Sequence, residues 1–359
     1  MIDLDFASDL DRSDLYDGLD VSGMRRLIAE FPEQCRLAWE AGERWEIPST
    51  FFKPRRVVIL GMGGSAIGAD VAATLALRMG AVPLQIVRGY TLPHVDEDTL
   101  VVAASYSGDT EETLEAFQAA LGTPGMRMAL TSGGRLARLA GQLGYAVLQY
   151  QYDGPPRAAI GWGIFPLLAV LERLGALDVT AESVATAVRE LGQASRDWGV
   201  GQPYAQNAAK QIAEALHGRV PVIIGPDFFE VAARRWAGQM SENAKQWAFH
   251  GALPEVNHNL IVGFGRPDLA REALHVLFLD SPLLHPRSRL RVRLTGEALD
   301  EAGIQHDELL IGGDEPLDVM LRGTYLGDWV SLYLAMLNAV DPTPIEPIDR
   351  LKARMARHG

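Results

Sequence analysis

Two short segments combine glycine and hydroxyl residues directly after apolar runs of the kind that form buried strands. The first is GMGGSAIG at residues 61–68, and the second is SYSGDT at residues 105–110. Backbone N–H groups at a helix start, together with the helix dipole, favour an anion, and glycine lets a ligand approach the backbone closely. Hydroxyls add hydrogen bonds, so a phosphate monoester can be bound without lysine. The predicted phosphate ligands are Gly64, Ser65, Ser105, Ser107 and Thr110.

Each loop alone also has a structural interpretation. Serine and threonine ahead of a helix are common N-caps, and Asp109 with Glu112 has the pattern of a capping box. The first loop also matches G-x-G-x-x-A, a weak dinucleotide fingerprint that expects an acidic residue after the second strand. Arg88 stands there instead, which suits NADP but leaves the SYSGDT loop without a role. The P-loop pattern G-x-x-x-x-G-K-[ST] does not occur.

The elements that must position these loops alternate regularly along the chain. Short apolar runs such as VVIL (57–60) and TLVVAAS (99–105) are each followed by a stretch with helical periodicity. One such helix is predicted to end at Gly80, and an earlier helix over residues 20–45 is predicted to be interrupted at Pro32. This alternation is typical of a parallel sheet covered on both faces.

The same rhythm restarts in the second half of the chain. VPVIIG (220–225) and the helical stretch after it align with the first strand and helix, which indicates a diverged internal repeat. The predicted divisions are a helical lead-in at 1–50, a phosphate-binding domain at 51–180, a second domain at 181–340 and a closing segment at 341–359.

Composition limits the class of protein. The 359 residues include 33 Lys and Arg against 46 Asp and Glu, a net charge of −13, which disfavours nucleic acid and anionic lipid as partners. No apolar run approaches the ~18 residues of a membrane span, and the acidic N-terminus lacks the features of a signal peptide. Cys35 is the single cysteine, and the histidines lack a metal-ligand spacing. We therefore expect a cytoplasmic protein that acts on a small molecule, with no metal, no nucleic acid and no membrane partner.

Seven motifs occur along the chain in a characteristic order: GMGGSAIG, SYSGDTEET, TSGG, PPRAA, SENAK, PEVNHN and IDRLK. The series resembles the bifunctional phosphoglucose/phosphomannose isomerases of the sugar isomerase (SIS) superfamily over nearly the whole chain. This resemblance implies an α/β fold of two SIS-type subdomains, each a parallel sheet flanked by helices in three α/β/α layers. It also implies a homodimer with shared active sites that interconverts glucose 6-phosphate or mannose 6-phosphate with fructose 6-phosphate, without metal or cofactor.

The main departure from the family pattern is Asp109, where asparagine is expected in SYSGNT. A carboxylate beside a phosphate repels it, unless the side chain points away as a helix cap.

The resemblance also assigns four residues around the sugar: Arg157 of PPRAA, Glu242 of SENAK, His258 of NHN and Lys352 of IDRLK. Aldose–ketose isomerisation needs ring opening and then transfer of a proton between C1 and C2 through an enediolate. Glu242 is the predicted base, and Arg157 is predicted to stabilise the enediolate oxygens. His258 is predicted to move a proton between the ring oxygen and the C1 hydroxyl, and Lys352 to assist ring opening or bind a hydroxyl.

These residues also have ordinary structural explanations. Glu242 is three residues before Lys245, so it can be a solvated helix-face partner of that lysine. His258 can be packed between subunits, and Lys352 can simply complement a helix dipole. Two other classes of function stay open as well, a noncatalytic sugar-phosphate-binding SIS regulator and an NADP-dependent oxidoreductase.

Overall fold

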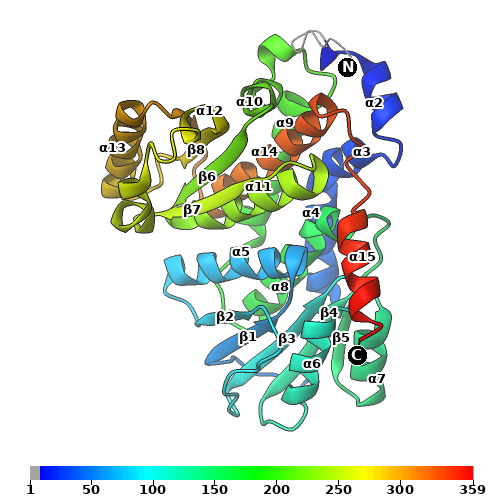
Figure 1. Ribbon diagram of the computed structural model, residues 1–359. Coiled ribbons are helices and arrows are strands. Elements are labelled where there is room, and N and C mark those ends of the chain that lie inside the picture. Colours follow the sequence, from blue (N-terminus) through cyan, green and yellow to red (C-terminus); the bar gives the residue numbers. More distant parts are fainter. Residues whose placement is uncertain (1–8, 359) are drawn as a thin grey trace. The chain divides into compact units, whose positions relative to one another are not determined.

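The computed structural model of the chain describes residues 9–358. These residues divide into two compact units, each discontinuous in sequence. The N-terminal sheet unit comprises residues 30–193 and 312–322, and the C-terminal sheet unit comprises residues 9–29, 194–311 and 323–358. Each unit contains one parallel sheet with helices packed on it (Figure 1). The two long helices α9 (Ala181–Trp198) and α14 (Pro316–Leu337) each have residues in both units.

Five parallel strands form the sheet of the N-terminal sheet unit, in the order β2-β1-β3-β4-β5. Every residue of β3 and β4 is buried, as expected for strands covered on both faces. Reversal of the strand order between β1 and β3 creates a switch point, where loops diverge and ligands bind in open α/β sheets. The strands are β1 (Arg56–Leu60), β2 (Leu84–Val87), β3 (Thr99–Ser105), β4 (Met126–Thr131) and β5 (Ala146–Gln149).

Helices form layers on the two faces of this sheet (Figure 1). On one face, Leu114 and Phe117 of α6 and Leu136 of α7 pack with buried strand residues such as Val101. On the other face, α5 contacts the sheet and also packs on α8, which in turn packs on α4. A side chain at Gly68 of α5 would overlap the carbonyl of Gly163 in α8, so the two helices approach at glycine. The helices are α4 (Phe31–Arg44), α5 (Gly63–Met79), α6 (Glu111–Ala120), α7 (Gly134–Gln142) and α8 (Ile160–Arg173), with a 3-10 turn η1 (Pro156–Ala158).

Four parallel strands form the second sheet, in the order β7-β6-β8-β9. One apolar cluster joins Ile224 and Phe278 of the sheet to Val292 and Leu299 of α13. Helix α11 packs on β6 and β7, and its buried Trp236 donates a hydrogen bond to the Gly323 carbonyl of α14 at 2.7 Å. The strands are β6 (Val220–Pro226), β7 (Phe249–Leu253), β8 (Leu274–Asp280) and β9 (Gln305–Leu310).

The remaining elements of the C-terminal sheet unit are helical. They are α2 (Ser13–Leu19), α3 (Met24–Ala29), η2 (Tyr204–Gln206), α10 (Ala208–Leu216), η3 (Asp227–Phe229), α11 (Glu230–Asn243), η4 (Glu255–His258), η5 (Leu260–Gly263), α12 (Ala270–Ala273), α13 (Pro286–Ala302) and α15 (Glu346–Met355).

The predicted pair of parallel sheets flanked by helices is confirmed. The interruption expected at Pro32 lies between α3 and α4, where Pro32 occupies the first turn of α4, and α5 ends with Gly80 in the left-handed conformation at φ 62°. Strand β7 was not predicted, because it is short, contains Gly251 and has no apolar alternation. The division into domains at residues 50, 180 and 340 stays a prediction.

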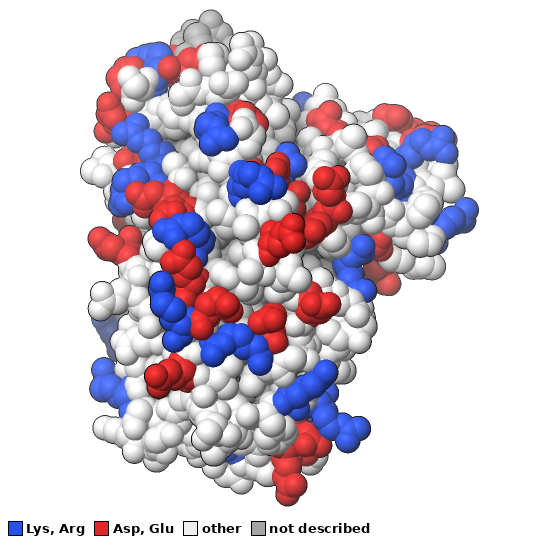
Figure 2. Space-filling view, turned by 180° about the vertical axis from the view of Figure 1, so that it is seen from behind, with Lys and Arg blue, Asp and Glu red and all other residues white. Residues whose placement is uncertain are grey.

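Charges of both signs are distributed over the surface. Figure 2 shows acidic and basic side chains interspersed over the face that it presents, with the acidic ones numerous. This mixture accompanies the net charge of −13.

One buried acid in the N-terminal sheet unit is not fully compensated by hydrogen bonds. Asp318, in the first turn of α14, is 2% exposed, and its Oδ1 has no hydrogen-bond partner among the described residues. Burial raises the pKa of Asp318 from 3.8 to about 6; Arg322 opposes this shift, whereas Glu190, Asp314 and Glu315 add to it. The folded protein therefore holds this proton more tightly than the unfolded chain does.

A buried carboxylate with a raised pKa makes stability fall as pH rises. The contribution of Asp318 is fully present below about pH 4 and is lost as the pH passes through about 6. We expect Asp318→Asn to be more stable than the wild type at pH 8 by up to about 3 kcal/mol, and the difference to shrink toward pH 4. Urea unfolding of both proteins at the two pH values measures this. An equal difference at pH 4 and pH 8 would show that burial does not perturb this carboxyl group.

Candidate active site

The two glycine- and hydroxyl-containing loops meet at the switch point of the first sheet. β1 and β3 are neighbouring parallel strands, with Leu60 paired to Ala103, so the segments that follow them leave the same edge. α5 begins at Gly63 and α6 at Glu111, each directly after its loop. The first-turn N–H groups of both helices have no partner within their own helix and can therefore donate to an anion.

Hydrogen bonds within the second loop and between the two loops hold the predicted hydroxyls together. The Ser105 and Thr110 hydroxyl oxygens are 2.9 Å apart, and the Ser105 hydroxyl accepts the Gly108 N–H at 3.1 Å. The Ser65 hydroxyl accepts the Tyr106 N–H at 3.3 Å, which ties the first loop to the second. The structure thus brings Ser65, Ser105 and Thr110 to one place.

Neither helix is capped by these residues. The N-cap of α5 is Met62 and that of α6 is Thr110, and neither side chain makes a capping hydrogen bond. Thr110 therefore occupies an N-cap position without capping through its side chain, whereas Ser65 and Ser105 lie outside N-cap positions, and their hydroxyls bond within and between the loops. Ser107 accepts the Asp109 N–H at 3.2 Å and is exposed to solvent.

Arg157 belongs to the same unit and lies beside the first loop. A β-carbon on Gly64 would be 3.1 Å from the Pro156 carbonyl oxygen and 3.8 Å from the Arg157 Cα, so a side chain there would require a small shift of the Pro156 backbone. Arg157 is 4% exposed, in contrast to a typical loop arginine, and lies in η1 after two prolines. A buried guanidinium at the edge of an anion site can stabilise a developing negative charge.

Tyr106 links the second loop to the segment that leads to Arg157. Its hydroxyl oxygen is 2.8 Å from the carbonyl oxygens of both Tyr152 and Gly154, which share its single proton. Burial raises the pKa of Tyr106 and the charge of Asp153 adds to that shift, so the phenol keeps its proton and remains a donor at neutral pH. Sequence analysis missed this residue, although it lies inside the SYSGDT motif.

The TSGG segment after β4 supports the second loop from its other side. The Ser132 backbone N–H and hydroxyl both donate to the Tyr106 carbonyl, at 3.1 and 2.6 Å. Leu136 donates its N–H to the Gly108 carbonyl at 2.8 Å. Gly108 has φ +67°, and a side chain there would overlap the Gly133 carbonyl. The sequence feature that indicates this contact is the position of TSGG at the end of β4, the parallel strand next to β3.

Asp109 points away from the hydroxyls. Its Oδ1 accepts the backbone N–H of Arg135 at 3.0 Å and the Arg135 Nε–H at 3.2 Å. Arg135 lies in the first turn of α7, where backbone N–H groups have no partner within the helix. Asp109 therefore accepts a hydrogen bond from one of these N–H groups. The predicted capping box with Glu112 on α6 is therefore wrong, and the departure at Asp109 is explained by its role at a different helix.

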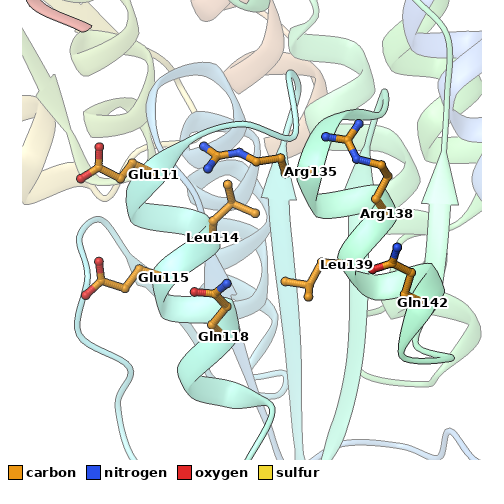
Figure 3. Close-up of a pocket in the computed structure, with 8 residues that line it drawn as sticks. All are labelled: Glu111, Leu114, Glu115, Gln118, Arg135, Arg138, Leu139 and Gln142. Carbon is orange, nitrogen blue, oxygen red and sulfur yellow. The ribbon is translucent and has the colours of Figure 1, made fainter. Parts of the chain in front are cut away.

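A groove of about 370 Å³ lies between α6 and α7 (Figure 3). It contains Glu111 and Glu115 on α6, opposite Arg135 and Arg138 on α7, with Leu114 and Leu139 between them. None of the predicted site residues lines this groove.

The contacts of Arg88 do not support the interpretation of the first loop as a dinucleotide-binding site. The Arg88 guanidinium forms an ion pair with Asp70 of α5, and its Nη2 is also 3.4 Å from the Ala66 carbonyl oxygen. Its charge is therefore compensated inside the protein.

Glu242 lies in the last turn of α11, in the C-terminal sheet unit, and is half-buried. Two buried polar contacts fix α11 against α14. Arg235 donates to both carboxylate oxygens of Asp328 at 3.0 Å, and Asn243 donates to the Ser331 hydroxyl at 2.9 Å. The end of the helix that carries Glu242 is thus held in a defined register.

His258 and Lys352 lie in the same unit as Glu242. His258 ends η4 and is exposed, and its neighbour Asn257 donates to the Thr295 hydroxyl of α13 at 2.8 Å. Lys352 is exposed on α15. The predicted residues therefore form two sets, one in each unit. Gly64, Ser65, Ser105, Ser107, Thr110 and Arg157 are in the N-terminal sheet unit, and Glu242, His258 and Lys352 are in the C-terminal sheet unit.

Two kinds of feature are absent from the described part of the chain. Within residues 9–358, no helix is both long and apolar enough to cross a membrane. In the same part of the chain, no group of three or more His, Cys, Asp or Glu residues is arranged to hold a metal ion.

Comparison with protein families matches both halves of the chain. The SIS domain model matches residues 50–140, and the model described as "Bacterial phospho-glucose isomerase C-terminal SIS domain" matches residues 205–355. Among solved structures, a hypothetical protein from Thermus thermophilus has a TM-score of 0.73 at 18% identity, over 98% of this chain and 94% of that one. This likeness shows the fold.

Curated relatives identify the family more narrowly. The chain is 35% identical to the bifunctional phosphoglucose/phosphomannose isomerase of Caldicellulosiruptor bescii, over 92% of this chain and 98% of that protein. It is 33% identical to the enzyme of the same name from Aquifex aeolicus, over 88% of this chain and 95% of that protein. With two parallel-sheet units in place and relatives of more than 30% identity along most of its length, the chain belongs to the bifunctional phosphoglucose/phosphomannose isomerase family.

Proposed function

We propose that this protein interconverts glucose 6-phosphate and mannose 6-phosphate with fructose 6-phosphate, by proton transfer through an enediolate and without a metal. The observation that carries the proposal is the set of hydroxyls and helix N-termini at the end of β1 and β3, which matches a phosphate monoester in charge and hydrogen bonding. The names of the two relatives, which align over most of the chain, support both substrates.

The phosphate is the anchor of the substrate in this proposal. Gly64 and Ser65 bind it from the first turn of α5, and Ser105, Ser107 and Thr110 bind it from the second loop. The hydrogen bonds that already hold Ser65 and Ser105 in place mean that little reorganisation accompanies binding. Binding energy from the phosphate then positions C1 and C2 for reaction.

Proton transfer takes place at the other end of the sugar. His258 moves a proton between the ring oxygen and the C1 hydroxyl, which opens the ring, and Lys352 binds a hydroxyl during that step. The Glu242 carboxylate then removes the C2 proton of the open aldose, and a proton passes from the C2 hydroxyl to the C1 oxygen of the enediolate. The carboxylic acid of Glu242 then returns its proton to C1, which leaves the C2 carbonyl of the ketose. Arg157 stabilises the negative charge on the enediolate oxygens. Removal of the proton from either configuration at C2 gives the same enediolate, so one base serves both aldoses.

The assembly and location of the protein belong to the same proposal. We infer a homodimer in which subunits share active sites, and a cytoplasmic location. The family supports the first inference, and the single, fully buried Cys35 suits a reducing compartment.

Removal of the carboxylate of Glu242 tests the proton-transfer step. We expect Glu242→Gln to lower kcat for both aldoses by about 10²- to 10⁴-fold, because the amide cannot accept the proton. Fructose 6-phosphate should bind to within about threefold of wild type, because the phosphate ligands are intact. Coupled assays of EDTA-treated protein and calorimetric titration measure the two quantities.

Glu301→Gln, on the exposed face of α13, is the matched control for Glu242→Gln. It removes one carboxylate from the same unit and should retain wild-type turnover. A wild-type protein that binds fructose 6-phosphate but turns over neither aldose would contradict the proposal and identify a noncatalytic SIS regulator.

The second loop can be disturbed without any change to a ligand side chain. Gly108→Ala combines an unfavourable φ of +67° with overlap of the Gly133 carbonyl, so the Ser105–Thr110 turn must move. We expect the Kd for fructose 6-phosphate to rise by at least about tenfold. Gly122→Ala is the control, since a side chain there meets nothing within 4 Å. Circular dichroism confirms folding, and equal affinities of the two variants would exclude this loop from the phosphate site.

The charge of Asp109 should oppose phosphate binding slightly. Asp109→Asn keeps an oxygen that can accept the Arg135 N–H but removes a negative charge from the loop. Because this side chain is half exposed, we expect only about a two- to fivefold gain in fructose 6-phosphate affinity, which diminishes at high salt. Titrations at low and high ionic strength measure it, and a salt-independent gain would point to a change of conformation instead.

A further inference from the structure

The end of α11 has an unusual backbone conformation at a lysine. Lys245 has φ +55°, in the left-handed region that normally favours glycine. It lies three residues after Glu242, which the proposed function identifies as the base. A non-glycine residue is unfavourable in this conformation, so a lysine here suggests that its side chain makes contacts that glycine cannot make.

The Lys245 ammonium connects two distant parts of the chain. Its Nζ donates to the backbone carbonyl of Glu242 at 2.6 Å and to the carbonyl of Pro342 at 3.1 Å. The last carbonyls of a helix have no partner within the helix, and a cation also complements the negative end of the helix dipole. Lys245 therefore completes α11 and at the same time binds the segment that follows α14.

Asn338 forms a second link between the same two segments. Its Nδ2 donates to the Ala244 carbonyl at 2.9 Å and to the Gln246 side-chain oxygen at 2.8 Å. The two links join residues 242–246 to residues 338–342, and we refer to these two segments together as the α11 junction. All of them lie in the C-terminal sheet unit.

The α11 junction also includes residues 338–342, which lead into α15 and are called the root of α15 below. Pro342 is four residues before Glu346, where α15 begins, and this helix carries Lys352. No residue of α15 is buried in the structure, so its own packing contributes little to the position of Lys352. The contacts at the root therefore have a large share in that position.

We propose that Lys245 is a positioning residue that holds Glu242 and the root of α15 in one arrangement, so that Glu242 and Lys352 act on the same substrate. This inference rests on the proposed function. It assigns Lys245 no contact with the substrate, because its ammonium is bonded to backbone carbonyls of the protein.

Three substitutions separate positioning from stability. Lys245→Met keeps the length of the side chain but removes the donors, Lys245→Gly also relieves the left-handed backbone, and Lys245→Arg retains a cation with several donors. We expect kcat of the Met and Gly variants to fall by about 10- to 100-fold, with the KM for fructose 6-phosphate within about twofold of wild type. Lys245→Arg should lie within about threefold of wild type. Lys53→Met, an exposed lysine of the N-terminal sheet unit, is the matched control.

The Gly variant gives a readout that a purely structural role would not produce. Because it relieves backbone strain, we expect its unfolding midpoint to equal or exceed that of Lys245→Met, although both lose turnover. A cycle with Lys352→Met adds a second readout. If Lys245 acts partly through Lys352, the loss caused by Lys245→Met should be several-fold smaller in the Lys352→Met background.

Hydrogen exchange tests the inference by a measurement that does not depend on catalytic activity. Peptides that cover residues 338–352 should exchange faster in Lys245→Met than in wild type or Lys53→Met. Wild-type kcat in Lys245→Gly, or unchanged exchange of these peptides in Lys245→Met, would overturn the inference. Absence of turnover in the wild type would instead refute the proposed function, and the exchange result would then decide alone whether Lys245 holds the root of α15.

Discussion

The edge of the first sheet where the two hydroxyl-containing loops meet depends on how closely one backbone can approach another. At Gly108 a side chain would overlap the Gly133 carbonyl, and at Gly64 it would be 3.1 Å from the Pro156 carbonyl oxygen. These approaches let the second loop lie against the TSGG segment and the start of α5 lie against the segment of Arg157, and backbone hydrogen bonds fix the first of these two pairs. The hydroxyls of Ser65 and Ser105 consequently have defined partners before any ligand arrives, which is the preorganisation that electrostatic binding of an anion requires.

A different kind of interaction holds the residues proposed for proton transfer. Helix α11 is fixed to α14 by a buried ion pair between Arg235 and Asp328 and by the Asn243–Ser331 hydrogen bond. Displacement of α11 by one turn would leave a buried charge without its partner, which costs several kcal/mol. The ion pair therefore fixes the position of α11 along α14, independently of its net contribution to the free energy of unfolding. Lys245 and Asn338 extend this control to the end of the helix, where Glu242 lies.

Two polar residues illustrate how a local pattern differs from a tertiary role. Asp109 and Glu112 have the spacing of a capping box, yet the Asp109 carboxylate accepts from Arg135 on another helix. Arg88 stands where a dinucleotide-binding protein places its ribose-contacting residue, yet it is paired with Asp70. In both cases the partner is distant in sequence. The spacing of residues therefore indicates which side chain can form a polar contact but not which residue it contacts. The same applies to Lys245, whose second carbonyl, that of Pro342, is 97 residues away.

By itself, the sequence determined the two parallel sheets, the break just before Pro32, the helix end at Gly80 and the position of the two hydroxyl-containing loops directly after strands of the first sheet. These features follow from periodicity, from the conformations that proline and glycine allow, and from the rule that parallel strands end at one edge. The short strand β7, the support of the hydroxyl loop by TSGG and the attachment of α15 through Lys245 were decided only in the tertiary structure. They arise from contacts between segments far apart along the chain, and such contacts leave no periodic signal in the residues that make them.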